Sequence, residues 1–265
     1  MNLHKLLLTQ NECYRAGRTI TPKGIMVHST GAENPTLRRY VGPDDGLLGV
    51  NPNNNHWNQA RPEGKQVCVH AFIGKLADGS IATYQTLPWH WRGWHAGGAA
   101  NNTHISFEIC EDGLSDASYF NAVYKEAVEF TAYLCKLYRL DPRADGVVIC
   151  HSEGNARGIA SGHADVMHWF PRHGKSMDTF RQDVAATLKG ESDMTKEEVR
   201  TIARQEVAAQ NAVYRNLEDV PEWGKRIVKK LLDRNAINGT GEGIDLPYET
   251  LRLLVINDRM GLYGE

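Results

Sequence analysis

The sequence predicts an α/β fold, in which helices cover a β-sheet, followed by a small helical module. Two short apolar runs, residues 24–28 and 146–150, are rich in β-branched residues and begin with glycine, a pattern typical of buried strands. Residues 121–138 carry apolar side chains at the spacing of an amphipathic helix. A helix that leads into a strand is typical of a sheet with helices on its faces.

Five strands are expected in the first 150 residues. The dipeptide Asp78-Gly79 predicts a hairpin turn between the second and the third. We expect the helix over 121–138 to end before Asp141-Pro142, because proline disfavours helical geometry in the preceding residue. The strands are expected at residues 24–28, 67–73, 81–85, 105–110 and 147–150.

Residues 31–66 form a long polar segment with many turn-forming residues. A loop of this length is uncommon in a compact domain unless it has a function. The segment is therefore either a substrate-binding loop or a surface insertion.

Composition excludes several classes of protein. A formal net charge of −2 over 265 residues gives no broad positive surface for nucleic acid. No apolar stretch reaches the roughly 18 residues of a membrane span. Residues 1–9 lack the basic and long apolar segments of a signal peptide, so none is expected. Five scattered cysteines without a CxxC pair favour buried free thiols in a reduced compartment over a disulfide framework.

A domain boundary is expected near residue 190, which divides the chain into residues 1–190 and 194–265. Thr195 and Glu198 form a capping box, which predicts a helix from Thr195 to about Leu217. Two short helices are expected after it, at residues 223–234 and 248–257. Because their apolar residues suffice only for a small core, docking or self-association of this module is expected.

Polar side chains follow two of the predicted strands. His28 ends the first strand, and His151 comes directly after the last. The segment His163-Ala164-Asp165 lies a short distance further along the chain. Two imidazoles and one carboxylate, with a fourth position open to water, are the ligand set of a catalytic zinc site. The sequence therefore predicts a zinc site at the rim of the sheet.

Five motifs, taken in order, resemble a known family. Together they are similar to the zinc-dependent N-acetylmuramoyl-L-alanine amidases (type 2 amidases) of the phage-lysozyme and peptidoglycan-recognition-protein superfamily, in particular to phage and prophage endolysins. The resemblance covers roughly residues 15–185. The motifs are Val27-His28-Ser29-Thr30, Val69-His70-Ala71-Phe72-Ile73, Gly93-Trp94-His95-Ala96-Gly97, residues 102–110 and Cys150-His151-Ser152-Glu153.

This resemblance implies a mixed central β-sheet flanked by helices, with one Zn²⁺ ion in a surface cleft. It implies that residues 1–190 are a catalytic domain that cleaves bacterial peptidoglycan between N-acetylmuramic acid and L-alanine with a zinc-activated water. It further implies synthesis in a host cytoplasm and later release to the cell wall. The alternative is a non-catalytic peptidoglycan-binding or recognition protein of the same fold.

The resemblance also assigns roles to individual residues. His28, His151 and Asp165 are the expected metal ligands, although Val166 stands where the family usually has proline. His163 then takes the place of a lysine that stabilises the oxyanion. In the alternative assignment His163 is the third ligand and Asp165 orients another histidine. His168 is a further candidate for the third ligand.

Three more residues are assigned to the cleft. The resemblance gives Glu108 the role of the general base, and a carboxylate within an apolar strand has a pKa raised toward the working range of a base. The alternative is a strand residue that faces solvent. His95 and Trp94 are expected to contact the substrate.

The C-terminal segment is similar to one half of a surface-layer-homology repeat, a module that binds cell-wall polymers. Only one copy is visible, whereas such architectures usually need several. Residues 194–265 are therefore expected either to bind the cell wall or to form a homodimer through their helices.

Overall fold

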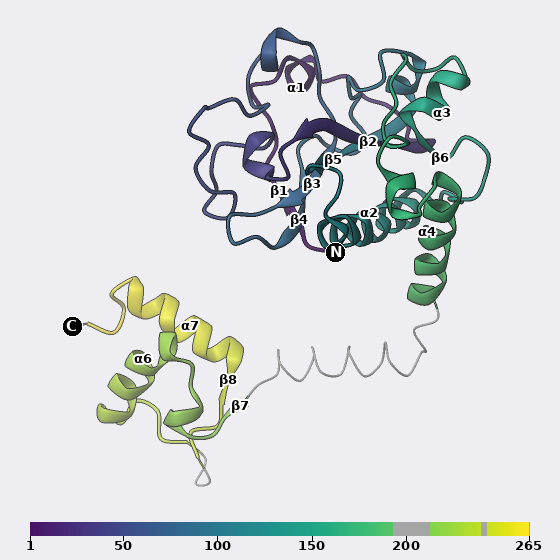
Figure 1. Cartoon of the computed structure of the whole chain (residues 1–265). Helices are drawn as coiled ribbons and strands as arrows, with labels where there is room; N and C mark the ends of the chain where they lie inside the picture. Colours follow the sequence, from purple (N-terminus) through teal and green to yellow (C-terminus); the bar gives the residue numbers. More distant parts are fainter. Residues whose placement is uncertain (193–212, 240–242, 265) are drawn as a thin grey trace. The chain divides into compact units, whose positions relative to one another are not determined.

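The computed structural model describes residues 1–192, 213–239 and 243–264. The chain divides into two compact units, Met1–Ser192 and Asp193–Glu265, and each is described here by itself. Figure 1 shows both units with their helices and strands labelled.

The first unit is built on a sheet of six strands in the order β1-β4-β3-β5-β2-β6. All neighbouring strands are parallel except β3 and β4, which form the antiparallel hairpin predicted at Asp78-Gly79. The mixed sheet confirms the expected fold class. The strands are β1 (Leu3–Lys5), β2 (Gly24–Glu33), β3 (Ala71–Lys75), β4 (Ile81–Gln85), β5 (His104–Glu111) and β6 (Val148–Cys150).

Two strand predictions need correction. The run 67–73 becomes a strand only from Ala71. The residues before Ala71 leave the sheet, and Cys68 pairs with Trp94 in an isolated antiparallel β-bridge. The edge strand β1 was not predicted, since three residues are too few to show an alternating pattern.

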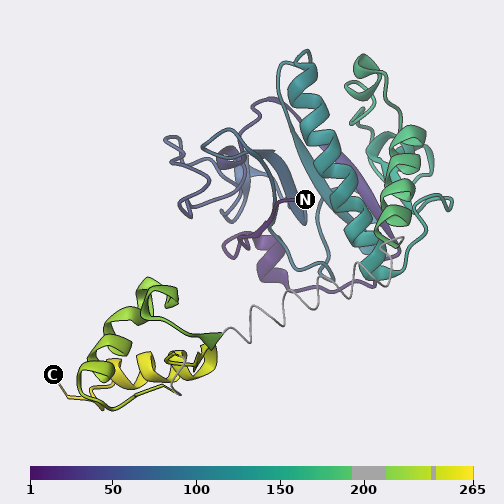
Figure 2. The same ribbon diagram turned by 90° about the horizontal axis from the view of Figure 1, so that it is seen from below.

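Helices cover the faces of this sheet. The longest, α2, begins four residues before its apolar pattern because the side chain of Asp116 accepts hydrogen bonds from the amides of Ser118 and Tyr119. It ends at Arg139, which adopts the left-handed conformation. Helix α4 lies beside α2, as both ribbon views show (Figures 1 and 2). The α-helices are α1 (Glu12–Ala16), α2 (Ala117–Tyr138), α3 (His151–Ala156) and α4 (Met177–Ser192), and the short 3₁₀ helices are Leu37–Arg39, Pro62–Gly64, Ala99–Asn102 and Phe170–His173.

The main hydrophobic core lies between the sheet and helices α2 and α4. Phe107 of β5 packs edge-on against Phe130 of α2, and Phe120 packs against Trp169. All four side chains are fully buried. This packing holds the central strands rigidly, which fixes the positions of the residues at their ends.

The prediction of free thiols was wrong for two cysteines. Cys13 and Cys68 form a disulfide across 55 positions of sequence. Asn11, the N-cap of α1, brings them together because its amide donates to the carbonyl of Val67 at 3.1 Å. Such a long-range contact leaves no mark in the spacing of the cysteines. The remaining three, Cys110, Cys135 and Cys150, are free and buried.

The second unit has a small core of its own. Strands β7 (Val213–Tyr214) and β8 (Leu246–Pro247) pair antiparallel, and helices α6 (Glu222–Asp233) and α7 (Tyr248–Arg259) pack against each other. The helix predicted from Thr195 lies mostly outside the described residues. Its predicted end at Leu217 was wrong, because Val213 and Tyr214 pair with β8 and a 3₁₀ turn covers Leu217–Asp219. Among the residues described, none of the helices has the length and apolar character to cross a bilayer.

Burial of His70 predicts a loss of stability in acid. This histidine has no exposed surface, and burial lowers its pKa to about 4. Since the unfolded chain takes up this proton first, at an ordinary pKa of about 6.5, the free energy of unfolding should fall between pH 6.5 and 4, by about 3 kcal/mol in total. Denaturant melts of the metal-free protein measure this. His70→Gln is the control, and its stability deficit relative to the wild type should shrink as pH falls; a deficit independent of pH contradicts the prediction.

Candidate metal centre and active-site cleft

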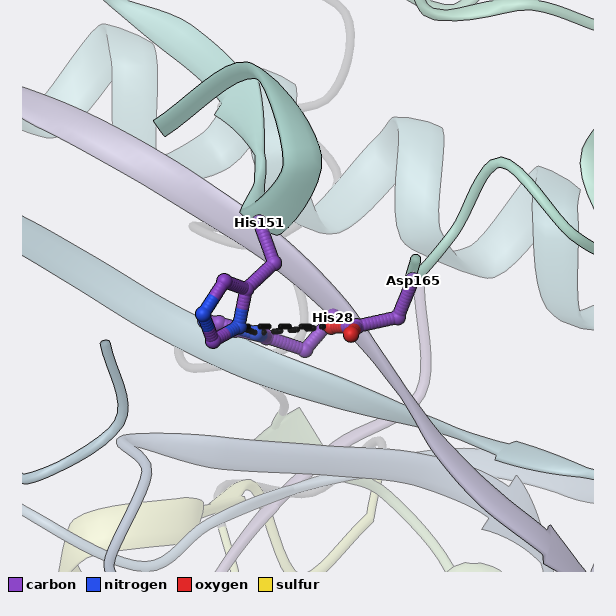
Figure 3. Close-up of side chains that lie close together, drawn as sticks. All are labelled: His28, His151 and Asp165. Atoms are coloured by element: carbon purple, nitrogen blue, oxygen red, sulfur yellow. Dashed lines mark hydrogen bonds and ion pairs between the residues drawn. The ribbon is translucent and has the colours of Figure 1, made fainter. Parts of the chain in front are cut away.

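Sheet register places His28 next to His151. Strands β2 and β6 are parallel neighbours, with Val27 paired to Cys150, so the next residue of each chain segment emerges at the same edge. There β2 continues as a strand, whereas His151 begins helix α3. Asp165 comes from the loop after α3. Figure 3 shows these three side chains directed at one point.

Three ligand-type atoms converge there. His28 Nδ1 lies 3.1 Å from His151 Nδ1 and 3.0 Å from Asp165 Oδ2, and the remaining separation, from His151 Nδ1 to Asp165 Oδ2, is 3.7 Å. Ligands about 2.0–2.2 Å from a tetrahedral zinc lie roughly 3.3–3.6 Å from one another. Within the described part of the chain, this is the one group of three such residues close enough to hold a metal ion. The donor set and its spacing therefore fit zinc.

The protonation states also suit a cation. Burial and the neighbouring His28 lower the pKa of His151 to about 4, so its imidazole is neutral. Burial alone would raise the pKa of Asp165, but the hydrogen bond to His28 and the two imidazoles lower it below its ordinary value. Metal ligands must be neutral imidazoles and ionised carboxylates. His151 and Asp165 meet these conditions near neutral pH.

Glu108 lies beside this cluster. It occupies the position of β5 that pairs with His28 of β2, and it lines the same cleft. Its side chain is half-buried, and its Oε2 is shut off from solvent without a hydrogen-bond partner in the described structure. Burial and the charges of Asp165 and Glu111 raise its pKa well above the ordinary value. The solvent-facing alternative for this residue is therefore not favoured.

The other predicted residues fall into two groups. His163, Trp94 and His95 all line the cleft. The ring of the exposed His163 lies 4.6 Å from that of His151 but is not one of the three converging groups. His168 is turned elsewhere, with its Nε2 3.0 Å from Glu111 Oε1.

The cleft has a volume of about 600 Å³. One wall comes from the long polar segment 31–66, through Arg39, Tyr40, Trp57 and Lys65 among others. That wall is braced internally, because Arg39 forms an ion pair with Glu63 and donates to the carbonyl of Asn55. Of the two readings of this segment, its position favours the substrate-binding loop.

Three further groups in the cleft could not be recognised from the sequence. Tyr40 is 3% exposed, and its hydroxyl has no partner among the described residues. Ser161 and Asn101 also line the cleft. Ser161 Oγ hydrogen-bonds to His151 Nε2, and Asn101 Oδ1 accepts a hydrogen bond from the backbone amide of His95. These residue types are common in loops, so only the tertiary contacts distinguish them.

Comparison with known proteins identifies the family. A family model described as N-acetylmuramoyl-L-alanine amidase matches residues 18–172, more than half of the chain. The chain belongs to this amidase family. No curated protein sequence matches it.

A solved hydrolase resembles the chain in fold. The hydrolase AmiA of Staphylococcus aureus, in complex with its ligand, superposes with a TM-score of 0.54 at 19% identity, over 74% of this chain and 86% of that one. PlyL gives 0.48 at 20% identity, over 69% and 96% of the two chains. The catalytic domain of XlyA gives 0.47 at 21% identity, over 69% and 99%. At these identities the likeness to AmiA supports the fold alone.

The converging groups predict which substitutions remove the metal. His28→Ala or Asp165→Ala should weaken zinc binding by at least about 10-fold, because each deletes one of three ligands. His163→Ala should leave zinc affinity within about 3-fold, since its ring stands outside the cluster. Competition with a chromophoric chelator measures all four proteins. If His163→Ala loses zinc while Asp165→Ala retains it, the assignment of the third ligand must be exchanged.

Proposed function

We propose that the protein is a zinc-dependent peptidoglycan hydrolase that cleaves the amide bond between N-acetylmuramic acid and L-alanine. The convergence of His28, His151 and Asp165 beside Glu108 in one cleft carries this proposal. Membership of the amidase family supports the type of bond. An endolysin-like role in the lysis of a bacterial wall is part of the same proposal.

The three converging residues would hold the ion through two neutral imidazoles and one ionised carboxylate. When bound, zinc would polarise the scissile carbonyl and activate water as a nucleophile. Because a cation would offset the negative charges around Glu108, its carboxylate would be ionised and able to act as a base.

Each remaining step uses a side chain of this protein. Glu108 takes a proton from the attacking water, whose oxygen bonds to the lactyl carbonyl carbon. His163 donates a hydrogen bond to the carbonyl oxygen as negative charge develops on it. The carbon–nitrogen bond then breaks, and Glu108 returns its proton to the amine of L-alanine. Trp94 and the wall of residues 31–66 contact the sugar and the stem peptide.

The non-catalytic alternative is less well supported. A recognition protein of this fold would arise by loss of a metal ligand or of the base. Here all three ligand positions are occupied by residues suited to zinc, and Glu108 stands beside them. We therefore favour the enzyme.

For the C-terminal unit we propose binding to the cell wall. Trp223 is 46% exposed and lies with Tyr248 and Arg252 around a hollow on the surface of this unit. Aromatic faces and guanidinium groups suit sugar rings and acidic groups. Dimerisation through the same helices is the competing role.

Digestion of purified peptidoglycan tests the proposed reaction. With zinc, the wild-type protein should release stem peptides that begin with a free L-alanine amine, identified by mass spectrometry. Glu108→Gln should bind zinc as the wild type does but lose turnover by about 10²-fold or more, since it lacks the base. Cleavage at a sugar–sugar or peptide–peptide bond would refute the proposed function, and full turnover by Glu108→Gln would place the base elsewhere.

Removal of residues 194–265 tests the role of the C-terminal unit. If the unit binds the wall, the truncated protein should no longer sediment with purified walls, while its mass in solution should fall only by the mass removed. Co-sedimentation and light scattering measure the two quantities. Unchanged sedimentation together with a switch from dimer to monomer would support dimerisation instead.

A further inference from the structure

The two imidazoles at the metal centre share one support, the loop between Gly93 and Gly97. We propose that this loop orients both ligand rings, and that Asn101 is the positioning residue that fixes the loop. This inference rests on the proposed function, because it concerns how the same site holds its ion.

The first ring is supported through His95. His28 directs Nδ1 at the cluster, so in the neutral ligand its proton is on Nε2. That nitrogen lies 3.0 Å from His95 Nδ1 and donates to it. The proton of His95 is then on its own Nε2, which is buried without a partner in the described structure. His95 therefore acts directly on His28, and neither of its ring nitrogens is left exposed for a hydrogen bond to a substrate.

The second ring is supported through Ser161. His151 likewise directs Nδ1 at the cluster, and its Nε2 donates to Ser161 Oγ at 3.2 Å. The serine hydroxyl in turn donates to the carbonyl of Ala96, also at 3.2 Å. The chain of hydrogen bonds from His151 therefore ends on the residue next to His95.

Asn101 holds these two neighbouring residues in place. Its Oδ1 accepts hydrogen bonds from the backbone amides of both His95 and Ala96, each at 2.9 Å. The asparagine is 7% exposed and lies in the 3₁₀ helix that precedes β5. Without this oxygen, two buried amides at the base of the cleft would lose their acceptor, which is unfavourable where water cannot replace it.

The glycines at the ends of the loop fit the same arrangement. Gly97 has a φ of +61°, and a Cβ there would lie 2.8 Å from Ser161 Oγ. A Cβ on Gly93 would lie 2.9 Å from the ring of His95. Side chains at either position would therefore displace the groups that receive the two imidazole protons.

These contacts link the metal ligands to a residue that touches neither of them. Groups that hydrogen-bond the far nitrogen of a ligand histidine fix its tautomer and orientation, and their loss typically weakens metal binding 10–100-fold. Loss of Asn101 should act on both ligands at once, whereas loss of Ser161 should act on His151 alone.

Zinc affinity of the full-length protein tests this proposal. Asn101→Leu keeps the approximate size of the side chain but removes the acceptor, and it should weaken zinc binding at least about 10-fold in a chelator competition. Asn101→Asp retains an acceptor oxygen and should bind zinc within about 3-fold of the wild type. The visible spectrum of the cobalt-substituted proteins should change in Asn101→Leu and be preserved in Asn101→Asp, because it reports ligand geometry.

Melting of the metal-free variants separates positioning from folding. If Asn101→Leu lowers only the melting temperature and leaves zinc affinity and the cobalt spectrum unchanged, the residue is merely structural and the proposal is wrong. Ser161→Ala provides a second variant that does not depend on the fold of the loop, and it should also weaken zinc binding.

The double variant Asn101→Leu/Ser161→Ala tests whether Asn101 and Ser161 act on His151 through the same loop. Its loss of affinity should be smaller than the product of the two single losses, because both act on His151 through Ala96. If the two losses of zinc affinity multiply, the loop is not a shared support for the two residues and the proposal is wrong. Absence of zinc binding by the wild type would overturn the proposed function and this inference with it, whereas wild-type binding with unaffected variants overturns this inference alone.

Discussion

Parallel pairing of β2 with both β5 and β6 sets the positions of His28, His151 and Glu108 in the cleft. The register that joins Val27 to Cys150 brings His28 beside His151, and the register on the other side brings Glu108 opposite His28. A shift of one residue in either pairing would turn the side chain to the opposite face of the sheet. The hydrophobic core beneath therefore acts on the chemistry indirectly, because it holds the register.

The convergence of polar groups at this edge has an energetic cost that a cation would offset. His28 and His151 are almost fully buried, and Glu108 has an oxygen without a partner in the described structure. Burial of such groups without full pairing is unfavourable. A bound divalent ion would compensate this cost, so occupancy of the site should couple to the stability of the surrounding strands.

The sequence was sufficient for those parts of the site that depend on local pattern. Glycine-bounded apolar runs located β2 and β6, and the imidazoles at their ends followed directly. The position of Asp165 shortly after His151 and the resemblance to the family both predict it as the third ligand, and the structure brings it to the same point. What the sequence could not reveal depends on contacts between distant segments: the disulfide of Cys13 with Cys68, and the roles of Asn101 and Ser161. Their residue types have many uses in loops, and hydrogen bonds such as those from the amides of His95 and Ala96 leave no periodic trace.

The two sides of the cleft differ in how they are built. The floor consists of strand ends whose positions the central sheet dictates. The facing wall, residues 31–66, is a segment of loops and short 3₁₀ helices that packs on β3 and β4 through Leu37, Tyr40 and Leu48. It is also braced by contacts within itself, including those of Arg39 with Glu63 and Asn55. Insertions or exchanges in that wall can reshape the cleft while the strand register stays intact. A change in the wall would therefore alter which molecules fit the cleft without moving the side chains at the strand ends.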